Sequence, residues 1–234
     1  MDRFYEANKA RMPKGASRER LDPQIRSQLR RERSQQARDD YIRQLRVRFG
    51  TELAPPPSER IAIDANPRGG PERGPADAPV TIVIFSDLEC GHCAHSHHRL
   101  DELQRERPNT IRLVYRHFPL GMHSHARYAA EVAVCADQQE QFWPLVEVLF
   151  ANQQQLQGPQ VRAYAEKQGL DMQQLDACLE SGKGRAIVEA DVAEGEELGI
   201  RSTPSFFVNG RFMVGLPYGE GLNALIDREA AAGG

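Results

Sequence analysis

The chain has 234 residues, of which 40% are hydrophobic and 27% charged, and no apolar run approaches the roughly 20 residues that a membrane-spanning helix needs. This composition indicates a soluble protein with one large domain, or one domain and an extension. The net charge of −3 is uneven, because residues 1–50 hold 14 Lys and Arg against 7 Asp and Glu. A basic tail can bind nucleic acid, but these mixed signs favour a solvated helix with ion pairs, and we expect no nucleic-acid partner.

Residues 1–50 are predicted to form an N-terminal helical arm. Within the arm, residues 22–50 read as one long helix, because Asp22 suits the N-cap, Pro23 the first helical position and Gly50 the end. Its apolar residues recur at multiples of four and form a narrow stripe that would pack on another surface. That surface could be the main domain, a second copy of the chain or a client protein. We favour docking or a homo-oligomer. The stripe comprises Ile25, Leu29, Ala37, Tyr41, Leu45 and Phe49.

Residues 51–79 are rich in Pro and Gly and are predicted to form a linker, with a possible short strand at 60–63. The rest, 80–234, is predicted to be a single α/β domain. It begins with a β-branched run typical of a buried strand. A helix, a second strand, a helical block, a hairpin at Asn209-Gly210 and a last helix follow. This order is that of a thioredoxin-like domain with an all-helical insertion, which we place at about 122–198.

Cys90 and Cys93 are the strongest chemical signal in the sequence. Cys90 follows a predicted strand and opens a predicted helix, where unpaired N–H groups and the positive end of the helix dipole stabilise a thiolate. His92, between the two cysteines, adds an ionisable donor. Cys93 lies one turn further along the same helix face, where a buried resolving thiol is expected. The pattern favours a redox pair in which Cys90 is a good leaving group.

An inert disulfide and half of a zinc site are the two other interpretations of this pair. A zinc site normally needs a second pair of ligands at matching spacing, but Cys135 and Cys178 are single and distant in sequence. Nitrogen ligands could come from His95, His97 and His98, although the last two are adjacent on a helix and point different ways. We therefore predict neither a metal nor a small-molecule cofactor.

The dipeptide Thr203-Pro204 stands directly before the predicted hairpin. Cis peptide bonds are nearly confined to X-Pro, and a thioredoxin fold has a cis-proline loop at this point, against the two cysteines. The backbone of Thr203 could then pair with an extended substrate peptide. Alone the dipeptide is an ordinary turn signal, but together with the cysteine pair it indicates a substrate-binding loop.

Residues 80–230 resemble the DsbA-like thioredoxin-fold family of thiol–disulfide oxidoreductases. The resemblance implies that Cys90 is both the thiol that attacks client disulfides and the sulfur that client thiols attack. It also implies that Cys93 resolves the mixed disulfide and that Thr203-Pro204 forms the cis-proline loop. The segments that carry it are "FSDLECGHC", "VYRHFPLGMHSHARYAAEVAVCA", "FWPLVEVLF", "GLDMQQLDACLESG" and "GIRSTPSFFVNGR".

The chain departs from the family pattern around the cysteines. Many thioredoxin-fold enzymes hold a buried carboxylate six residues before the first cysteine, where this chain has Ile84. Asp87 and Glu89 are nearer, but we expect both on the surface. The pair Gly91-His92 and the threonine before the cis-proline are similar to those of protein disulfide isomerases. An oxidase and an isomerase therefore both stay open.

The resemblance also implies a structural Cys135–Cys178 disulfide in the helical insertion, with two buried free cysteines as the alternative. We expect no catalytic role for His117, His123 or His125, which are interpreted as caps or core-edge contacts.

The function implied by the resemblance is to form or rearrange disulfide bonds in exported proteins. It implies protein substrates with cysteines and a membrane-bound redox partner protein. It also implies a periplasmic or otherwise exported location. No signal peptide is visible in the polar start "MDRFYEANKA", which fits either a cytosolic chain or one whose signal has been removed. A chaperone-like binding module that uses the N-terminal arm is the main alternative, and metal handling is a further one.

Overall fold

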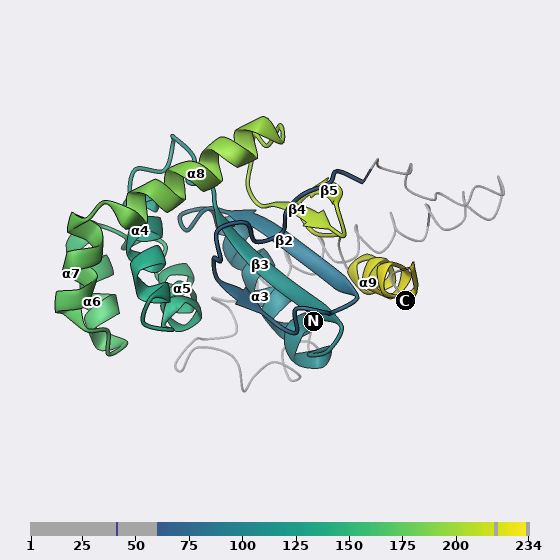
Figure 1. The fold of residues 1–234 in the computed structure, drawn as a ribbon, viewed down its shortest axis with the longest axis horizontal. Helices are drawn as coiled ribbons and strands as arrows, with labels where there is room; N and C mark the ends of the chain where they lie inside the picture. Colours follow the sequence, from purple (N-terminus) through teal and green to yellow (C-terminus); the bar gives the residue numbers. More distant parts are fainter. Residues whose placement is uncertain (1–40, 42–59, 218–219, 233–234) are drawn as a thin grey trace, which may run out of the picture. The chain divides into compact units, whose positions relative to one another are not determined.

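The computed structural model describes Tyr41, residues 60–217 and residues 220–232 (Figure 1). The predicted helix at 22–50, apart from Tyr41, and the first part of the predicted linker lie outside the described residues. The elements, in chain order, are β1 (Glu72–Arg73), β2 (Val80–Ser86), α3 (Gly91–Glu106), β3 (Ile111–His117), α4 (Ala126–Asp137), α5 (Phe142–Ala151), α6 (Gly158–Lys167), α7 (Met172–Glu180), α8 (Lys183–Glu197), β4 (Ser205–Val208), β5 (Arg211–Val214) and α9 (Glu220–Ala232).

A five-stranded sheet in the order β1-β3-β2-β4-β5 forms the centre of the domain. Strands β2 and β3 are parallel, and the other neighbours are antiparallel. The parallel pair is joined through α3, as a parallel connection requires. This mixed sheet with its helices confirms the predicted α/β, thioredoxin-like class.

Strand β2 is buried on both faces, which explains its unbroken run of β-branched and aromatic residues. On one face, Ile82 and Ile84 pack into the larger core with Leu100 of α3 and Leu222 of α9. On the other face, Val83 and Phe85 belong to a smaller cluster that the end of α8 and the segment around Ile63 cover. The cysteines at the end of this strand therefore stand on a rigid support.

The helices α4 to α8 follow one another between β3 and β4. Figure 1 shows α4 to α7 gathered to one side of the sheet, with α8 leading back toward β4. Helix α4 is the centre of this group and packs against α5, α6, α7 and α8. Its many alanines have small side chains, which allow this close approach, and eight of its twelve residues are buried.

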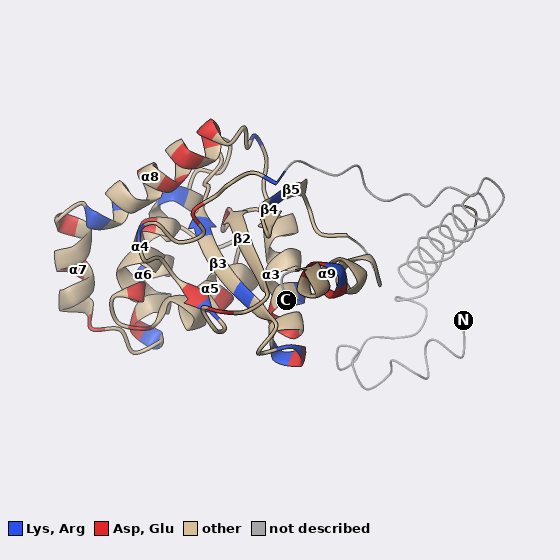
Figure 2. Ribbon diagram, turned by 45° about the vertical axis from the view of Figure 1, so that its right-hand side comes forward, with Lys and Arg blue, Asp and Glu red and all other residues tan. Residues whose placement is uncertain are grey.

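A buried ion pair joins the end of this helical group to the sheet. Arg116 of β3 is 1% exposed and donates to Asp191 Oδ1 of α8 at 3.1 Å. The other Asp191 carboxylate oxygen accepts from the backbone N–H of His117 at 3.0 Å. Arg68 approaches Asp191 and Glu194 from outside, and acidic residues gather along this end of α8 (Figure 2). The network fixes α8 against the strand that lies beside β2.

The hairpin between β4 and β5 has the predicted turn. Asn209 and Gly210 both adopt positive φ angles, of 46° and 79°, as a two-residue turn of this kind needs. The Asn209 side chain accepts from the backbone N–H of Thr81 at 2.8 Å and donates to the Pro79 carbonyl at 3.0 Å. The turn residue thus also ties the hairpin to the start of β2.

The prediction of a strand at 60–63 is wrong. These residues have no regular secondary structure. The backbone N–H of Ile61 donates to the Gly210 carbonyl at 2.9 Å. The segment meets the tip of the hairpin, where the chain turns, and so finds no strand to pair with. The short strand β1, inside the predicted linker, was not expected from its Pro- and Gly-rich sequence.

Candidate active site

Cys90 is the N-cap residue of α3, directly after the end of β2 and a short turn. Its side chain is largely buried, with 8% of the residue exposed. Its sulfur lies 3.5 Å from the carbonyl oxygen of Thr203. The peptide bond between Thr203 and Pro204 is cis, and this loop faces the start of α3. The structure therefore brings the pair Cys90 and Cys93 together with Thr203 and Pro204, although the two pairs are more than 100 residues apart in sequence.

The two thiols of the pair have opposite electrostatic environments. The pKa of Cys90 is lowered to about 5, mainly by a hydrogen bond from the Cys93 thiol, while burial opposes the shift. The backbone N–H of Cys93, the side chain of Thr203 and the backbone N–H of His92 lower it further. Burial raises the pKa of the Cys93 thiol, and the neighbouring Cys90 raises it further. Cys90 is therefore the thiolate of the pair near neutral pH, and Cys93, which is 0% exposed, is the protonated partner.

His92 lies between the cysteines with its side chain exposed. Its backbone N–H, rather than its ring, is the part that stabilises the Cys90 thiolate. The ring lines a groove beside the pair instead. His92 is thus placed near the site, but the contact differs from the ionisable donor that the sequence suggested.

Asp87 is buried, so its expected surface position is wrong. The residue is 1% exposed, and its carboxylate accepts from the backbone N–H of Glu89 and of Leu120 and contacts His123 Nδ1, each at 2.7 Å. Its own backbone N–H donates to the sulfur of Cys93 at 3.4 Å. These donors satisfy the hydrogen-bonding capacity of the buried carboxylate. Sequence reasoning missed this role, because two of the partners of the carboxylate, Leu120 and His123, are more than 30 residues away in sequence.

Glu89 is half-buried and also has a structural role. Its carboxylate accepts from the backbone N–H groups of His125 and Ala126, both at 2.7 Å. These groups open α4, where N–H donors have no partner inside the helix. The turn before Cys90 thereby caps the first helix after β3, and the His125 backbone lies at the cap as expected.

The other histidines near the cysteines do not converge. His97 packs against Phe150 and Trp143, with ring centroids 4.9 and 6.3 Å apart, and burial lowers its pKa to about 4. His98 is exposed and faces Glu102 at 3.5 Å. Within the part of the chain that the structure describes, no group of three or more His, Cys, Asp or Glu is arranged to hold a metal ion.

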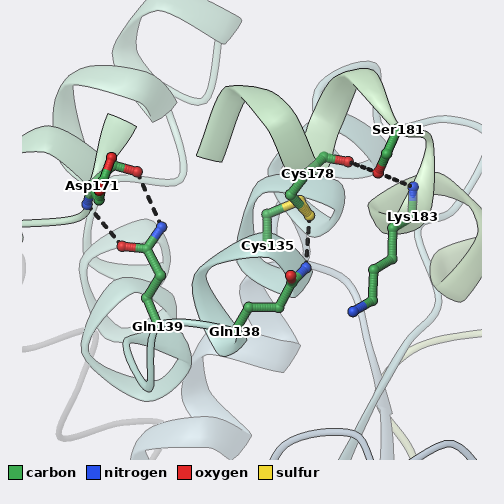
Figure 3. The surroundings of a disulfide bond; sticks show 7 residues. All are labelled: Cys135, Gln138, Gln139, Asp171, Cys178, Ser181 and Lys183. Carbon is green, nitrogen blue, oxygen red and sulfur yellow. Dashed lines mark hydrogen bonds between the residues drawn. A yellow bond between two sulfur atoms is a disulfide. The ribbon is translucent and has the colours of Figure 1, made fainter. Parts of the chain in front are cut away.

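The remaining two cysteines form a disulfide that joins α4 to α7 (Figure 3). The Cα atoms of Cys135 and Cys178 are 5.8 Å apart, and both residues are buried. Gln138 Nε2 donates to the sulfur of Cys178 at 2.8 Å. The bond lies within the helical group, away from the turn that carries Cys90.

A low-pKa cysteine at a strand–helix junction, a buried second cysteine one turn later and a cis-proline loop against them define a thioredoxin-fold protein with a thiol pair at the expected place. Residues 68–228 match a thioredoxin family, and the chain belongs to it. Its fold is that of the DsbA-like thiol–disulfide oxidoreductases, which confirms the resemblance found in the sequence.

Several solved structures share this fold. A thioredoxin-like oxidoreductase from Silicibacter pomeroyi DSS-3 is 27% identical with a TM-score of 0.60, over 71% of this chain and 94% of that one. DsbA2 from Pseudomonas aeruginosa is 28% identical with a TM-score of 0.55, over 67% and 92%. The thiol-disulfide exchange protein alpha-DsbA2 from Wolbachia pipientis is 17% identical with a TM-score of 0.63, over 72% and 89%, and shows the fold alone.

Curated relatives in sequence are longer proteins. The chain is 36% identical over 152 residues to the Na(+)/H(+) antiporter NhaA 1 of Salinispora arenicola (strain CNS-205), which is 64% of this chain and 23% of that protein. It is 37% identical over 143 residues to the Na(+)/H(+) antiporter NhaA of Herminiimonas arsenicoxydans, 61% of this chain and 23% of that protein. The chain thus spans about a quarter of the length of these relatives. Among its described helices, none is long and apolar enough to cross a membrane.

Proposed function

We propose that this chain is a protein thiol–disulfide oxidoreductase that forms or rearranges disulfide bonds in exported proteins, with Cys90 as its reactive thiol and Cys93 as its resolving thiol. The observation that carries the proposal is the place of the Cys90 sulfur, at the start of α3 and 3.5 Å from the Thr203 carbonyl oxygen, where its pKa is lowered to about 5. A thiolate is the reactive form in disulfide exchange, and a thiol of low pKa is the better leaving group. The fold shared with solved oxidoreductases supports the same chemistry.

In the oxidising direction, a client thiolate attacks the Cys90 sulfur of the disulfide form. The bond between Cys90 and Cys93 breaks, and Cys93 leaves and takes up a proton, as its raised pKa favours. A second client thiolate then attacks the client sulfur of the mixed disulfide, and Cys90 leaves as a stabilised thiolate. The client has lost two electrons and the cysteine pair has gained them, so a redox partner protein must take them up.

For rearrangement, the reduced pair works in the opposite sense. The Cys90 thiolate attacks a wrong client disulfide, which forms a mixed disulfide with Cys90 and frees one client thiolate. A different client thiolate then attacks the client sulfur bound to Cys90, so that a new client disulfide forms and Cys90 leaves as the thiolate. Both directions use the same two sulfur atoms. We place the protein in the periplasm or another exported compartment, with a membrane-bound redox partner. Assembly of copies through residues 1–50 stays a prediction.

Ribonuclease provides the test, with the full chain and its Cys90→Ser variant compared side by side. Scrambled ribonuclease in a mild thiol buffer should regain activity if the protein rearranges disulfides, and fully reduced ribonuclease should be oxidised quickly if the protein forms them. Either reaction should disappear in Cys90→Ser. A binding module in which the thiols are secondary would instead slow aggregation of ribonuclease equally well with and without Cys90, and would catalyse neither reaction.

A further inference from the structure

A groove of ≈ 380 Å³ lies directly beside the cysteine pair, between the first two turns of α3, the cis-proline loop and the segment after β5. Thr203, whose carbonyl faces the Cys90 sulfur at 3.5 Å, is one of its lining residues, and so is His92. A segment of a client protein bound through its cysteine to Cys90 would therefore continue into this groove. Its two walls differ in chemistry.

The wall formed by α3 is basic. His92, His95 and Arg99 all line the groove, and their spacing of three and four residues places them on one face of the helix. No Asp or Glu is among the described residues that line it. Arg99 Nη1 contacts Glu102 at 3.2 Å, but Glu102 is 41% exposed and lies outside the lining, so this contact orients the guanidinium in a solvated position.

The opposite wall is apolar. Pro204, Val214, Leu216 and Pro217 line it. Val214, at the end of the edge strand β5, is 63% exposed, which is unusual for a large aliphatic side chain in this domain. An apolar wall facing the Arg99 guanidinium and two imidazole rings fits a segment that carries an aliphatic side chain on one side and a carboxylate on the other.

We propose that this groove selects client segments in which an acidic side chain lies about three residues from the reacting cysteine. The inference rests on the proposed function, because it names the class of client for the same site. The distance follows from the helix, because His95 and Arg99 lie five and nine residues after Cys90. These spacings are about 7.5 and 13.5 Å along the axis, which correspond to about two and four residues of extended peptide and centre on about three. Acidic side chains at that distance would meet Arg99 and His95 and stay clear of the sulfur atoms.

The test measures how fast the reduced full chain attacks short peptides whose single cysteine carries a 2-nitro-5-thiobenzoate group through a disulfide. The Cys90 thiolate attacks the peptide sulfur, a new disulfide forms between Cys90 and the peptide, and the coloured thiolate leaves with the bonding electrons. Three peptides differ only at the third residue on each side of the cysteine, which is Asp, Asn or Lys. We expect the Asp peptide to react about fivefold faster than the Lys peptide at low salt, with Asn between them.

Matched variants locate the effect. The Arg99→Gln variant should bring the Asp and Lys rates close together, and His95→Gln should reduce the difference independently. Arg105→Gln is the control, because it removes the same charge from the same helix but Arg105 pairs with Asp101 away from the groove. It should keep the full preference. High salt should weaken the preference in the unmodified protein, since the contacts are exposed to solvent.

The outcomes separate the two proposals. Equal rates for all three peptides, each dependent on Cys90, would overturn the charge selection and leave the oxidoreductase intact. A preference that survives both Arg99→Gln and His95→Gln, or that Arg105→Gln removes, would also overturn it. Release that does not depend on Cys90 would overturn the proposed function itself, and the selection with it.

Discussion

The Cys90 sulfur draws its low pKa mainly from groups within one helical turn, and Thr203 of the cis-proline loop adds to them. The largest contribution is the hydrogen bond from the Cys93 thiol, and the N–H groups of His92 and Cys93 add to it. These contributions come from the geometry of a helix start, so they need no charged side chain nearby. Ile84, at the position where many thioredoxin-fold enzymes hold a buried carboxylate, is 1% exposed in the core, and the buried carboxylate nearest the pair is that of Asp87.

Alkylation of the reduced protein should report this thiolate. The rate of Cys90 modification by iodoacetamide should rise with pH around pH 5 and then stay level, because the thiolate is fully formed above its pKa of about 5. In Cys93→Ala the midpoint should move to higher pH, since the main hydrogen bond is lost. Cys90→Ser is the control for background labelling. A midpoint near pH 8.5, the value for an unperturbed thiol, would contradict the geometry.

His123 and Asp87 form a second pair whose effect should depend on pH. Burial acts to lower the pKa of His123, but the hydrogen bond and charge of Asp87 outweigh it, so the pKa is raised. A histidine with a raised pKa adds stability that is complete below its unfolded pKa, near 6.5, and is lost as the pH rises through its folded value. The contact should therefore matter most in mildly acidic solution.

The His123→Asn variant tests this. We expect a loss of about 1–2 kcal/mol in the free energy of unfolding at pH 6, and a smaller loss at pH 9. Urea unfolding followed by circular dichroism provides the measurement. His98→Asn is the matched control, because His98 is exposed and faces Glu102, which is itself exposed. If His123→Asn lowers the free energy of unfolding equally at both pH values, the charge of the imidazole contributes nothing and the prediction is wrong.

At the scale of the elements, the turn between β2 and α3 organises more than the cysteines. Asp87 holds the backbone of Leu120, after β3, and Glu89 caps α4. The start of the helical group is thus fixed by the same turn, residues 87–90, that places Cys90. At its other end, Asp191 fixes α8 to β3. Because these contacts hold the helical group at both ends, we expect the Cys135–Cys178 disulfide inside it to have no effect on the position of Cys90.

The Cys135–Cys178 disulfide should be a stabilising device and not part of the chemistry. It closes a loop with a sequence separation of 43, for which chain entropy predicts about 4 kcal/mol of stabilisation. The variant with Cys135→Ala and Cys178→Ala should unfold at lower urea concentration by this order, while Cys90 alkylation keeps its rate. Mass measurement after alkylation of Cys90→Ser/Cys93→Ser without reductant should find no blocked thiol, and two blocked thiols would contradict the bond.

At the scale of the whole molecule, the features found from sequence are those that local patterns encode. The β-branched run of β2, the Asn-Gly turn and the helix opened by Cys90 each leave a signature within about ten residues. The burial of Asp87 and Arg116 leaves no such local signature in the sequence, because their partners, His123 and Asp191, come from distant parts of the chain. Strand β1 was missed for the same reason, since its two residues are strand-like only through pairing with β3.

Trp143 gives the molecule a built-in optical probe. It is the single tryptophan of the chain, and it belongs to α5 in the helical group. Its ring stacks on His97 of α3, and the Arg73 guanidinium of β1 lies 4.4 Å from its centroid. The indole belongs to the helical group and contacts both the helix that begins after Cys90 and the edge of the sheet. Any movement of α3 during a turnover would change its emission, so the reaction could be followed in real time without a label.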